Sequence, residues 1–210
     1  MKRRMLFVSS VLALGVLGAA PAARASAVVF RDNFNADGYQ LNWTPSSVWT
    51  VPVGSVDLIG KTPSGTGFNL FPGNGGYVDL DGTSNAAGAL QTTRTFAAGT
   101  YRLSFDLGGN ARGDVAKTTT ITLGDWSKSL TLASGAPLER YSYTFTTTGG
   151  KLRFADNAAG NQDIGNVLDN VKLADPPGAP EASTWAMMAL GFAGLGFAGL
   201  RRGKPAASIA

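Results

Sequence analysis

Tyr101-Arg102-Leu103-Ser104-Phe105-Asp106-Leu107 is the stretch of sequence that decides the fold. Its apolar and polar residues alternate, so an extended chain places the apolar set on one face and the polar set on the other. Residues 141–145, Tyr-Ser-Tyr-Thr-Phe, repeat this pattern. Such alternation is typical of antiparallel strands with one face in a core and one face in water. The two stretches therefore predict two strands that contribute to one core.

Further short runs rich in Thr, Val, Phe and Tyr are separated by Gly, Asn, Asp and Ser, which is typical of strands joined by turns. Residues 26–175 have no long segment with a helical period. Many short strands at this spacing predict an all-β fold, a two-sheet sandwich of the jelly-roll type. The expected strands span residues 27–31, 47–51, 56–59, 76–80, 89–96, 100–107, 117–123, 128–132, 139–147, 151–154 and 167–173.

The first 25 residues predict a signal peptide helix. Three basic residues at positions 2–4 precede an apolar run at 6–17, and Ala23-Arg24-Ala25 is an Ala-x-Ala cleavage site. Signal peptidase would then release a mature chain that begins at Ser26. The alternative is an uncleaved N-terminal membrane helix, for which the apolar run is short. We therefore expect the Sec machinery to export the chain across the inner membrane.

The C-terminus carries a second targeting pattern. Pro180-Glu181-Ala182 precedes an apolar run, Trp185–Leu200, which repeats Gly-Phe-Ala-Gly-Leu and ends at Arg201-Arg202. At ~1.5 Å per residue the run is roughly 24 Å long, short of a hydrocarbon core of ~30 Å, and counting from Ala182 makes a span feasible. We expect a C-terminal transmembrane helix with its basic end on the cytoplasmic side.

These segments divide the chain. We expect a signal peptide at 1–25, a β-sandwich domain at 26–175, a Pro-rich linker at 176–180, a C-terminal signal at 180–204 and a short tail at 205–210. Seven of the 18 basic residues and one of the 14 acidic residues lie in the terminal segments, so the domain has 11 basic and 13 acidic residues. A net charge of about −2, without a basic patch that contains interleaved aromatic residues, predicts no nucleic-acid partner.

The residue types that are missing exclude several kinds of chemistry. The chain has no His and no Cys, which excludes a Ser-His-Asp triad, a Cys nucleophile, a usual zinc site and disulfides. Glycoside hydrolysis needs only two carboxylates, and Asp79 and Asp81 would share one face of a strand. Asp81-Gly82 is also ordinary turn chemistry, and no Gly-rich phosphate loop opens a helix. We therefore expect no catalytic residues, no cofactor-binding site and no enzymatic activity.

The C-terminal pattern closely resembles the PEP-CTERM sorting signal of Gram-negative bacteria. The residues that carry the resemblance are Pro180, Glu181, Ala182, Arg201 and Arg202; Ala182 stands where the family usually has a second Pro. The resemblance implies processing by an exosortase, a membrane-embedded cysteine protease. It also implies a precursor held transiently in the inner membrane, then a cell-surface or extracellular protein associated with exopolysaccharide or biofilm. The alternative is an ordinary C-terminal anchor.

The domain itself resembles the galactose-binding-like sandwiches, which are distant relatives of carbohydrate-binding modules. Asp32-Asn33-Phe34-Asn35, Tyr77-Val78-Asp79-Leu80-Asp81 and Leu168-Asp169-Asn170-Val171 carry this resemblance. It implies a structural calcium ion, with Asp169 at a ligand position. Asn35 stands where related modules usually have Glu, and Asp37 is a nearby carboxylate that could compensate. The alternative is that Asp169 only forms hydrogen bonds with the N-terminal loop.

Carbohydrate binding, if present, would depend on exposed aromatic rings beside polar groups. Trp126, Trp43 and Tyr39 are the candidates for stacking on a glycan, although large aromatic residues usually lie in cores. Three hypotheses follow: a non-enzymatic surface or matrix protein, a carbohydrate-binding module with a specific glycan and structural calcium, and a minimal glycosidase. The third requires two carboxylates that face each other across a cleft.

Overall fold

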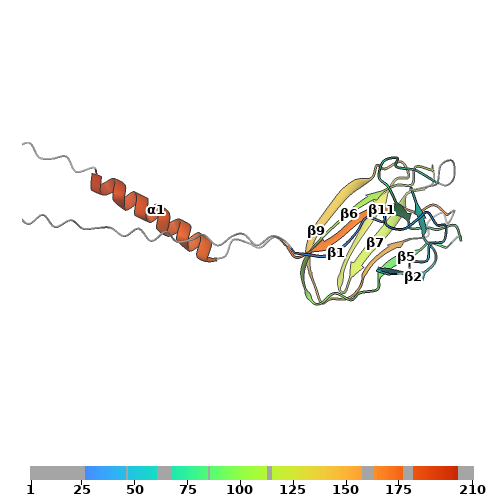
Figure 1. The fold of residues 1–210 in the computed structure, drawn as a ribbon, viewed down its shortest axis with the longest axis horizontal. Helices are drawn as coiled ribbons and strands as arrows, with labels where there is room; N and C mark the ends of the chain where they lie inside the picture. Colours follow the sequence, from blue (N-terminus) through green and yellow to red (C-terminus); the bar gives the residue numbers. More distant parts are fainter. Residues whose placement is uncertain are drawn as a thin grey trace, which may run out of the picture. The chain divides into compact units, whose positions relative to one another are not determined.

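The computed structural model describes the domain and one C-terminal helix (Figure 1). The described residues are 27–45, 47–60, 68–84, 86–112, 115–157, 163–176 and 182–202, with the helical side chains described only for 186–197. One compact unit comprises Ser26–Pro176. The predicted signal peptide with Ala23, Ala25 and Ser26, linker residues 177–180 and the motif residues Pro180 and Glu181 lie outside the described residues.

The described residues of this unit form eleven strands, one in each region where the sequence predicts a strand. In chain order they are β1 (Val28–Asp32), β2 (Trp49–Val53), β3 (Asp57–Ile59), β4 (Tyr77–Asp79), β5 (Ala89–Thr92), β6 (Gly99–Gly108), β7 (Lys117–Leu123), β8 (Trp126–Leu132), β9 (Glu139–Thr147), β10 (Leu152–Asp156) and β11 (Val167–Ala174).

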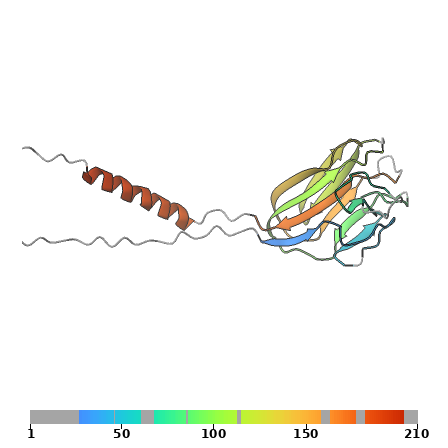
Figure 2. The same ribbon diagram turned by 45° about the horizontal axis from the view of Figure 1, so that its top comes forward.

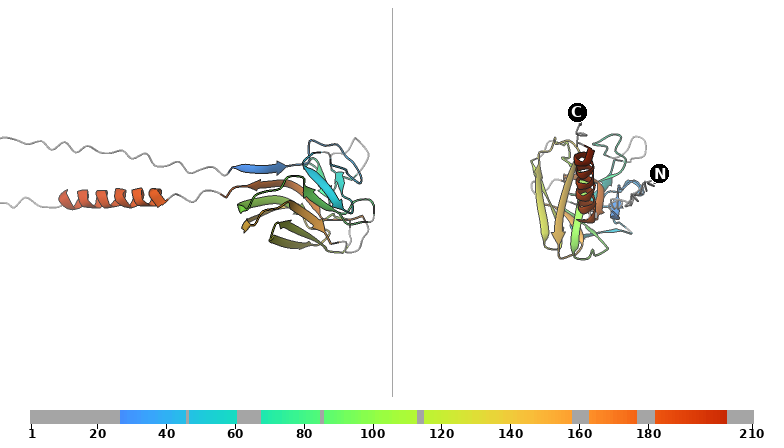
Figure 3. Two further views of the ribbon diagram at one scale, coloured as in Figure 1. Left: turned by 90° about the horizontal axis from the view of Figure 1, so that it is seen from below. Right: turned by 90° about the vertical axis from the view of Figure 1, so that its left-hand side faces the viewer.

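The strands form two antiparallel sheets, which confirms the predicted all-β two-sheet sandwich (Figure 3). Sheet A has the order β3-β4-β11-β6-β9, and β1 also pairs with β11, as Figure 2 shows for the blue and orange strands. Sheet B has the order β2-β5-β10-β7-β8. The longest pairing joins β6 to β9, from Gly99 opposite Thr147 to Leu107 opposite Glu139.

The strand β5 is shortened most relative to its predicted range. The sequence predicts a strand over residues 89–96, but β5 ends at Thr92. The Thr92 hydroxyl donates to the carbonyl of Arg94 at 2.9 Å and accepts the amide of Leu152 at 3.1 Å. This local bonding turns the chain away from the ladder, and Phe96 then forms an isolated bridge with Gly150.

The core follows the alternation of the deciding stretch. Tyr101, Leu103, Phe105 and Leu107 are buried, whereas Arg102, Ser104 and Asp106 are exposed or half-buried. Every second residue of β6 therefore enters the space between the sheets. The polar set forms part of the outer face of sheet A, which carries the site described below.

Aromatic residues fill the end of the core near β1 and β2. Trp49 is 1% exposed, and its ring lies 5.2 Å from Phe30, 5.9 Å from Phe34 and 6.4 Å from Phe154 between centroids. Its Nε1 donates to the carboxylate of Asp32 at 2.7 Å. Trp49 therefore joins residues of both sheets and of the loop that follows β1.

The C-terminal pattern forms a helix, α1 (Ala182–Arg202). In the part of the chain that the structure describes, no helix is long and apolar enough to cross a membrane. The prediction of a helix at this position is confirmed, but the prediction that it crosses a membrane is not. The apolar run within it, Trp185–Leu200, measures only roughly 24 Å at ~1.5 Å per residue.

Candidate functional site: a polar groove on sheet A

Polar side chains from four strands share the outer face of sheet A. The register places Arg31 of β1 opposite Lys172 of β11, Lys172 opposite Ser104 of β6, and Ser104 opposite Ser142 of β9. Residues directly opposite each other in an antiparallel sheet point to the same face. These four residues therefore form one continuous row across the sheet.

A groove follows this row. Its main cavity has a volume of about 520 Å³ and is lined by Arg31, Asn33, Ser104, Arg140, Asn170 and Lys172, among other residues. A second cavity of about 270 Å³ shares Ser104, Arg140 and Lys172 and adds Arg102 and Ser142. Because the two cavities share these residues, we treat them as one elongated surface, the sheet A groove.

An ion pair fixes Arg140, which both cavities of the sheet A groove share. Arg140 donates to Asp106 through Nε at 2.7 Å and through a terminal nitrogen at 3.1 Å. Asn170 donates its side-chain amide to the same carboxylate at 2.8 Å. The hydrogen bond to Asp106 raises the pKa of Arg140 above its ordinary value. The Asp106 charge is therefore neutralised by partners within the groove.

Asn170 reaches the groove because β11 is irregular there. The pairing of β11 with β6 shifts between Asp169 and Lys172, and Asn170 has a positive φ of 50°. Asn is one of the residue types that tolerate this left-handed conformation. The irregularity turns the Asn170 amide toward Asp106 and brings Lys172 opposite Ser104.

The other cations of the groove have no acidic partner of this kind. Within the described ranges, no ion pair involves Arg31, Arg102 or Lys172. Arg102 donates its Nε to the hydroxyl of Ser142 at 3.0 Å, and all three cationic side chains are exposed. The groove thus presents uncompensated positive charge beside serine hydroxyls.

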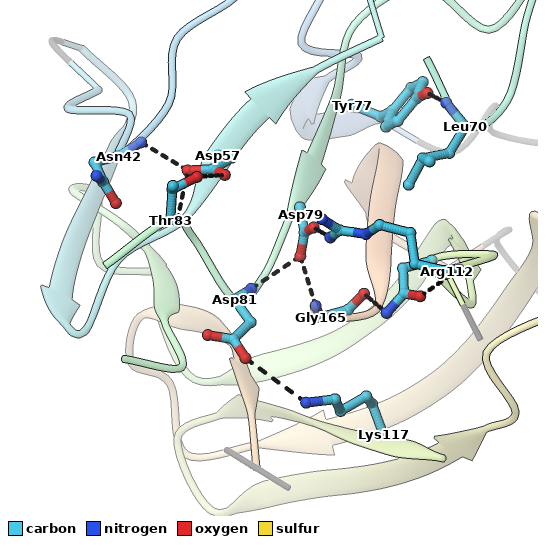
Figure 4. A network of polar contacts seen from close by, with 11 residues as sticks. Asn42, Asp57, Leu70, Tyr77, Asp79, Asp81, Thr83, Arg112, Lys117 and Gly165 are labelled. Carbon is cyan, nitrogen blue, oxygen red and sulfur yellow. Dashed lines mark hydrogen bonds and ion pairs between the residues drawn. The ribbon is translucent and has the colours of Figure 1, made fainter. Parts of the chain in front are cut away.

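The two carboxylates considered for acid–base chemistry lie elsewhere and are buried (Figure 4). Asp79 is 1% exposed, forms an ion pair with Arg112 and accepts the backbone amides of Gly165 at 2.8 Å and Asp81 at 3.1 Å. Burial raises the pKa of Asp79 to about 8, although Arg112 opposes this shift. Asp81 is fully buried, with an oxygen 3.7 Å from Nζ of Lys117. Neither carboxylate is accessible to a polymeric substrate.

A third buried carboxylate in the same region also connects loops. Asp57 accepts the amide of Asn42 at 2.6 Å, and the amide and hydroxyl of Thr83 at 3.1 and 2.6 Å. Figure 4 shows Asp57 pointing toward these two residues, whereas Asp79 and Asp81 point toward Arg112 and Lys117. The three carboxylates thus contact different segments: Asp57 the loops at Asn42 and Thr83, Asp79 Arg112 and Gly165, and Asp81 Lys117 of β7.

The predicted glycan-stacking residues are not brought together. Trp43 is 5% exposed and packs edge-on against Phe34, so the prediction that it stacks on a glycan is corrected to a core role. Trp126 is half-buried and lies parallel to Phe145 at 3.8 Å, which covers one of its ring faces. Tyr39 is half-buried against the cluster around Tyr77. Among the described residues, no ring contact joins any two of the three candidates.

The predicted calcium ligands have other partners. The Asp169 carboxylate, 1% exposed, accepts the amide of Asn170 at 2.6 Å and its side-chain nitrogen at 3.0 Å. It therefore bonds its neighbour rather than the N-terminal loop. Burial raises its pKa to about 7, and the charges of Asp106 and Asp32 add to this shift. Asn35 accepts the amide of Gly76 at 2.7 Å through its side-chain oxygen.

Asp37, the third predicted ligand, is exposed. In the described part of the chain, no group of three or more acidic, His or Cys side chains is placed to hold a metal ion. Of the predicted set, Asp169 has the chemistry most suited to a hard cation, because its carboxylate is buried without a paired cation at hydrogen-bond distance.

The residues of the sheet A groove are not among the site residues that the sequence predicts. The prediction that Arg102, Ser104 and Asp106 face water is confirmed, but the alternation does not indicate that Arg102 and Ser104 line a groove. The available signal was the concentration of cations at outward positions of the strands: Arg31, Arg102, Arg140 and Lys172. The groove forms only because β1 pairs with β11, and these are the first and the last strand of the domain in sequence.

No protein-family model matches the sequence, and no curated protein matches it. Solved structures are similar in fold at low identity. The K3 cleaved adhesin domain of Lys-gingipain from Porphyromonas gingivalis W83 is 15% identical with a TM-score of 0.46, covering 72% of this chain and 100% of that chain. The CBM22-1 xylan-binding domain of a Paenibacillus barcinonensis xylanase is 13% identical with a TM-score of 0.38, covering 75% and 100%.

The CBM22-1 and GH10 modules of endo-1,4-β-D-xylanase 10B from Clostridium thermocellum, complexed with xylohexaose, are 10% identical with a TM-score of 0.44. This match covers 75% of the present chain, which spans 30% of the xylanase chain. A family 35 carbohydrate-binding module from the same organism is 13% identical with a TM-score of 0.37, covering 60% and 92%. The likeness concerns the fold alone: the chain contains an all-β two-sheet sandwich, and structures similar to it include carbohydrate-binding modules.

Proposed function

We propose that this chain is an exported, non-enzymatic surface or matrix protein whose sandwich domain associates with extracellular polysaccharide through the sheet A groove. The observation that carries the proposal is the groove itself, in which guanidinium, ammonium, amide and hydroxyl groups from four strands meet at one surface. Polysaccharides present dense hydroxyl groups, and such polar side chains are suited to bind them. The volume of about 520 Å³ also suits a small-molecule or sugar-sized ligand, for which about 300–1,000 Å³ is typical.

The elongated form of the groove favours a polymer over a single sugar. The two cavities share Ser104, Arg140 and Lys172, so a ligand that follows them contacts β1, β11, β6 and β9 in turn. The buried states of Asp79 and Asp81 support a binding role rather than hydrolysis, because both carboxylates are already paired with cations and Asp79 also accepts backbone amides.

The terminal sequence patterns support export and sorting. The basic segment, apolar run and Ala-x-Ala site favour release of the mature chain by signal peptidase. The resemblance of the C-terminal pattern to PEP-CTERM signals favours processing by an exosortase near Pro180-Glu181-Ala182. We propose that the processed domain is retained at the cell surface or in an exopolysaccharide layer, where its groove would contact glycan.

A variant that fills the groove tests this function. Ser104 is half-buried and lines both cavities, so Ser104→Trp would occupy the space with a large ring. In affinity gel electrophoresis with neutral and acidic polysaccharides in the gel, we expect at least one polysaccharide to retard the full chain. We expect Ser104→Trp to bind it at least about tenfold more weakly, a loss of about 1.4 kcal/mol.

The control introduces the same ring on the opposite sheet. Ser127 of β8 is exposed and pairs with Thr122 on the outer face of sheet B. Ser127→Trp should be retarded as strongly as the unchanged protein. Equal retardation of the Ser104→Trp chain, or no retardation by any polysaccharide, would contradict the proposed function.

We also propose that the fold binds a structural calcium ion through Asp169, with Asn35 and Asp37 as further candidates. The buried Asp169 carboxylate is a suitable hard ligand, and a side-chain amide oxygen such as that of Asn35 is also a ligand type that calcium accepts. A cation that binds only the folded state must raise the melting temperature, by the equivalent of about 2.7 kcal/mol at 100 times its dissociation constant.

The calcium prediction is checked by calorimetry of the full chain in EDTA and in millimolar calcium. We expect calcium to raise the melting temperature by several degrees, since ~1 kcal/mol corresponds to ~2–4 °C in a domain of this size. Asp169→Asn should remove the response, and Asp175→Asn, a change at an exposed position, should retain it. An identical melting temperature in calcium and EDTA would show that no such ion contributes.

A further inference from the structure

The cations of the sheet A groove are arranged in a way that does not help the fold. Arg31 and Lys172 are direct cross-strand partners, so they carry like charges on one face of adjacent strands. Side chains in such pairs have Cβ atoms about 4.5–5.5 Å apart, and like charges in this position destabilise a sheet. No acidic side chain in the described ranges forms an ion pair with either of them.

Arg102 adds a third positive charge to the same surface. It lies two residues before Ser104 on β6, and Ser104 is the partner of Lys172, so Arg102 and Lys172 flank one serine while Arg31 lies on the far side of Lys172. Successive same-face positions of a strand are about 6.8 Å apart. Arg102 is the diagonal neighbour of Lys172, at about 7–8 Å, which is close to the Debye length of ~8 Å at physiological salt, so screening between these two charges is incomplete.

The carboxylates near the groove form no ion pair with Arg31, Arg102 or Lys172 in the part of the chain that the structure describes. Asp106 is already paired with Arg140 in a two-point contact and accepts the Asn170 amide. Asp32 lines the main cavity, and its carboxylate accepts the Phe34 amide at 2.9 Å and the indole of Trp49 at 2.7 Å. Arg31, Arg102 and Lys172 therefore remain available to an anion from outside the protein.

The remaining lining of the groove indicates which kind of anion fits. Serine hydroxyls lie between the cations, and the residues that line the two cavities include no aromatic ring. The groove therefore has no ring on which a nucleic-acid base or the apolar face of a neutral sugar could stack. An arginine fork binds carboxylate in a two-point geometry, and serine can both donate to and accept from sugar hydroxyls.

We propose that the sheet A groove binds an acidic polysaccharide, with its carboxylates held by Arg31, Arg102 and Lys172 and its hydroxyls by Ser104 and Ser142. This inference rests on the proposed function and specifies its ligand class. Single-stranded nucleic acid is the competing polyanion. The lack of aromatic lining and the net negative charge of the domain, 13 acidic against 11 basic residues, disfavour it.

The experiment compares polymers that differ only in charge. Isothermal titration of the full chain is performed with polygalacturonate and with the same polymer after reduction of its carboxyl groups to neutral alcohols, at low and high salt. We expect polygalacturonate to bind about tenfold more tightly or better, and high salt to weaken its binding because the cations are exposed.

Single-charge variants locate the interaction. Arg31→Gln and Lys172→Gln should each weaken polygalacturonate binding several-fold, whereas Lys151→Gln, which removes an exposed cation outside the groove, should leave it unchanged. If Lys172 served only to stabilise the fold, Lys172→Gln would lower the melting temperature. We expect the opposite, an equal or higher melting temperature, because the substitution relieves repulsion from Arg31.

The outcomes separate the inference from the function on which it rests. Equal binding of the charged and reduced polymers would overturn the inference and leave the proposed glycan association intact. Binding of neither polymer would overturn the inference, and with no retardation by any other polysaccharide it would overturn the function too. Tighter binding of single-stranded nucleic acid than of polygalacturonate would assign the cations to a different macromolecule and overturn the inference.

Discussion

Replacing Trp49 with alanine is expected to lower the free energy of unfolding by about 3–5 kcal/mol. The ring is 1% exposed and touches Phe30, Phe34 and Phe154, so its removal opens a cavity that these neighbours can fill only in part. The substitution also removes the Nε1 donor of the Asp32 carboxylate. A half-buried carboxylate without this donor adds to the loss.

The loss of unfolding free energy in Trp49→Ala is measured by urea unfolding of the full chain. Far-ultraviolet circular dichroism follows the transition, because the substitution removes a tryptophan and so alters the fluorescence signal. Trp126→Ala is the matched comparison, since Trp126 is half-buried and contacts Phe145 and Tyr143 at the edge of the sandwich. We expect a smaller loss there. An equal or smaller loss at Trp49 than at Trp126 would contradict the arrangement of the core.

Replacing Lys117 with methionine is expected to cost about 3–5 kcal/mol, as large as the loss at Trp49. Lys117 is 1% exposed on β7, and its ammonium group lies 3.7 Å from the fully buried carboxylate of Asp81. Burial already raises the pKa of Asp81, and Lys117 opposes that shift. Without Lys117, the fold must either bury an uncompensated charge or bind a proton at Asp81.

A second variant distinguishes charge from packing. Replacing both partners, in Lys117→Met with Asp81→Leu, should recover most of the lost stability, because an apolar pair of similar volume often replaces a buried ion pair at little cost. Lys151→Met, at an exposed position, should stay within about 0.5 kcal/mol of the unchanged protein. If the double variant is as unstable as Lys117→Met or more so, the loss comes from packing rather than from an unpaired charge.

Local pattern was sufficient to predict the sandwich. The alternation in β6 and β9 reflects burial of one face, and the predicted ranges 117–123 and 139–147 coincide with β7 and β9. The prediction was wrong where a side chain competes with the ladder, as at Thr92, whose hydroxyl bonds two backbone groups and ends β5 early. Such competition depends on Leu152, a residue that the local pattern does not include.

The site was less accessible to prediction because it depends on long-range register. Arg31 and Lys172 lie near opposite ends of the domain's sequence, and only the pairing of β1 with β11 makes them neighbours in space. The partners of Asp79 and Asp81 are likewise distant: Arg112 follows β6 and Lys117 begins β7. Aromatic residues were the sequence guide to glycan binding, but Trp43 is used in the core and the groove contains cations instead.

The most direct test of the central claim is to map the glycan site by heteronuclear NMR. The isotope-labelled full chain is titrated with an oligosaccharide of galacturonic acid, and the backbone amide shifts are followed. The account predicts that the largest changes occur at Arg31, Ser104 and Lys172 on the outer face of sheet A. Changes centred on Trp126 and Tyr39, or no saturable change anywhere, would contradict it.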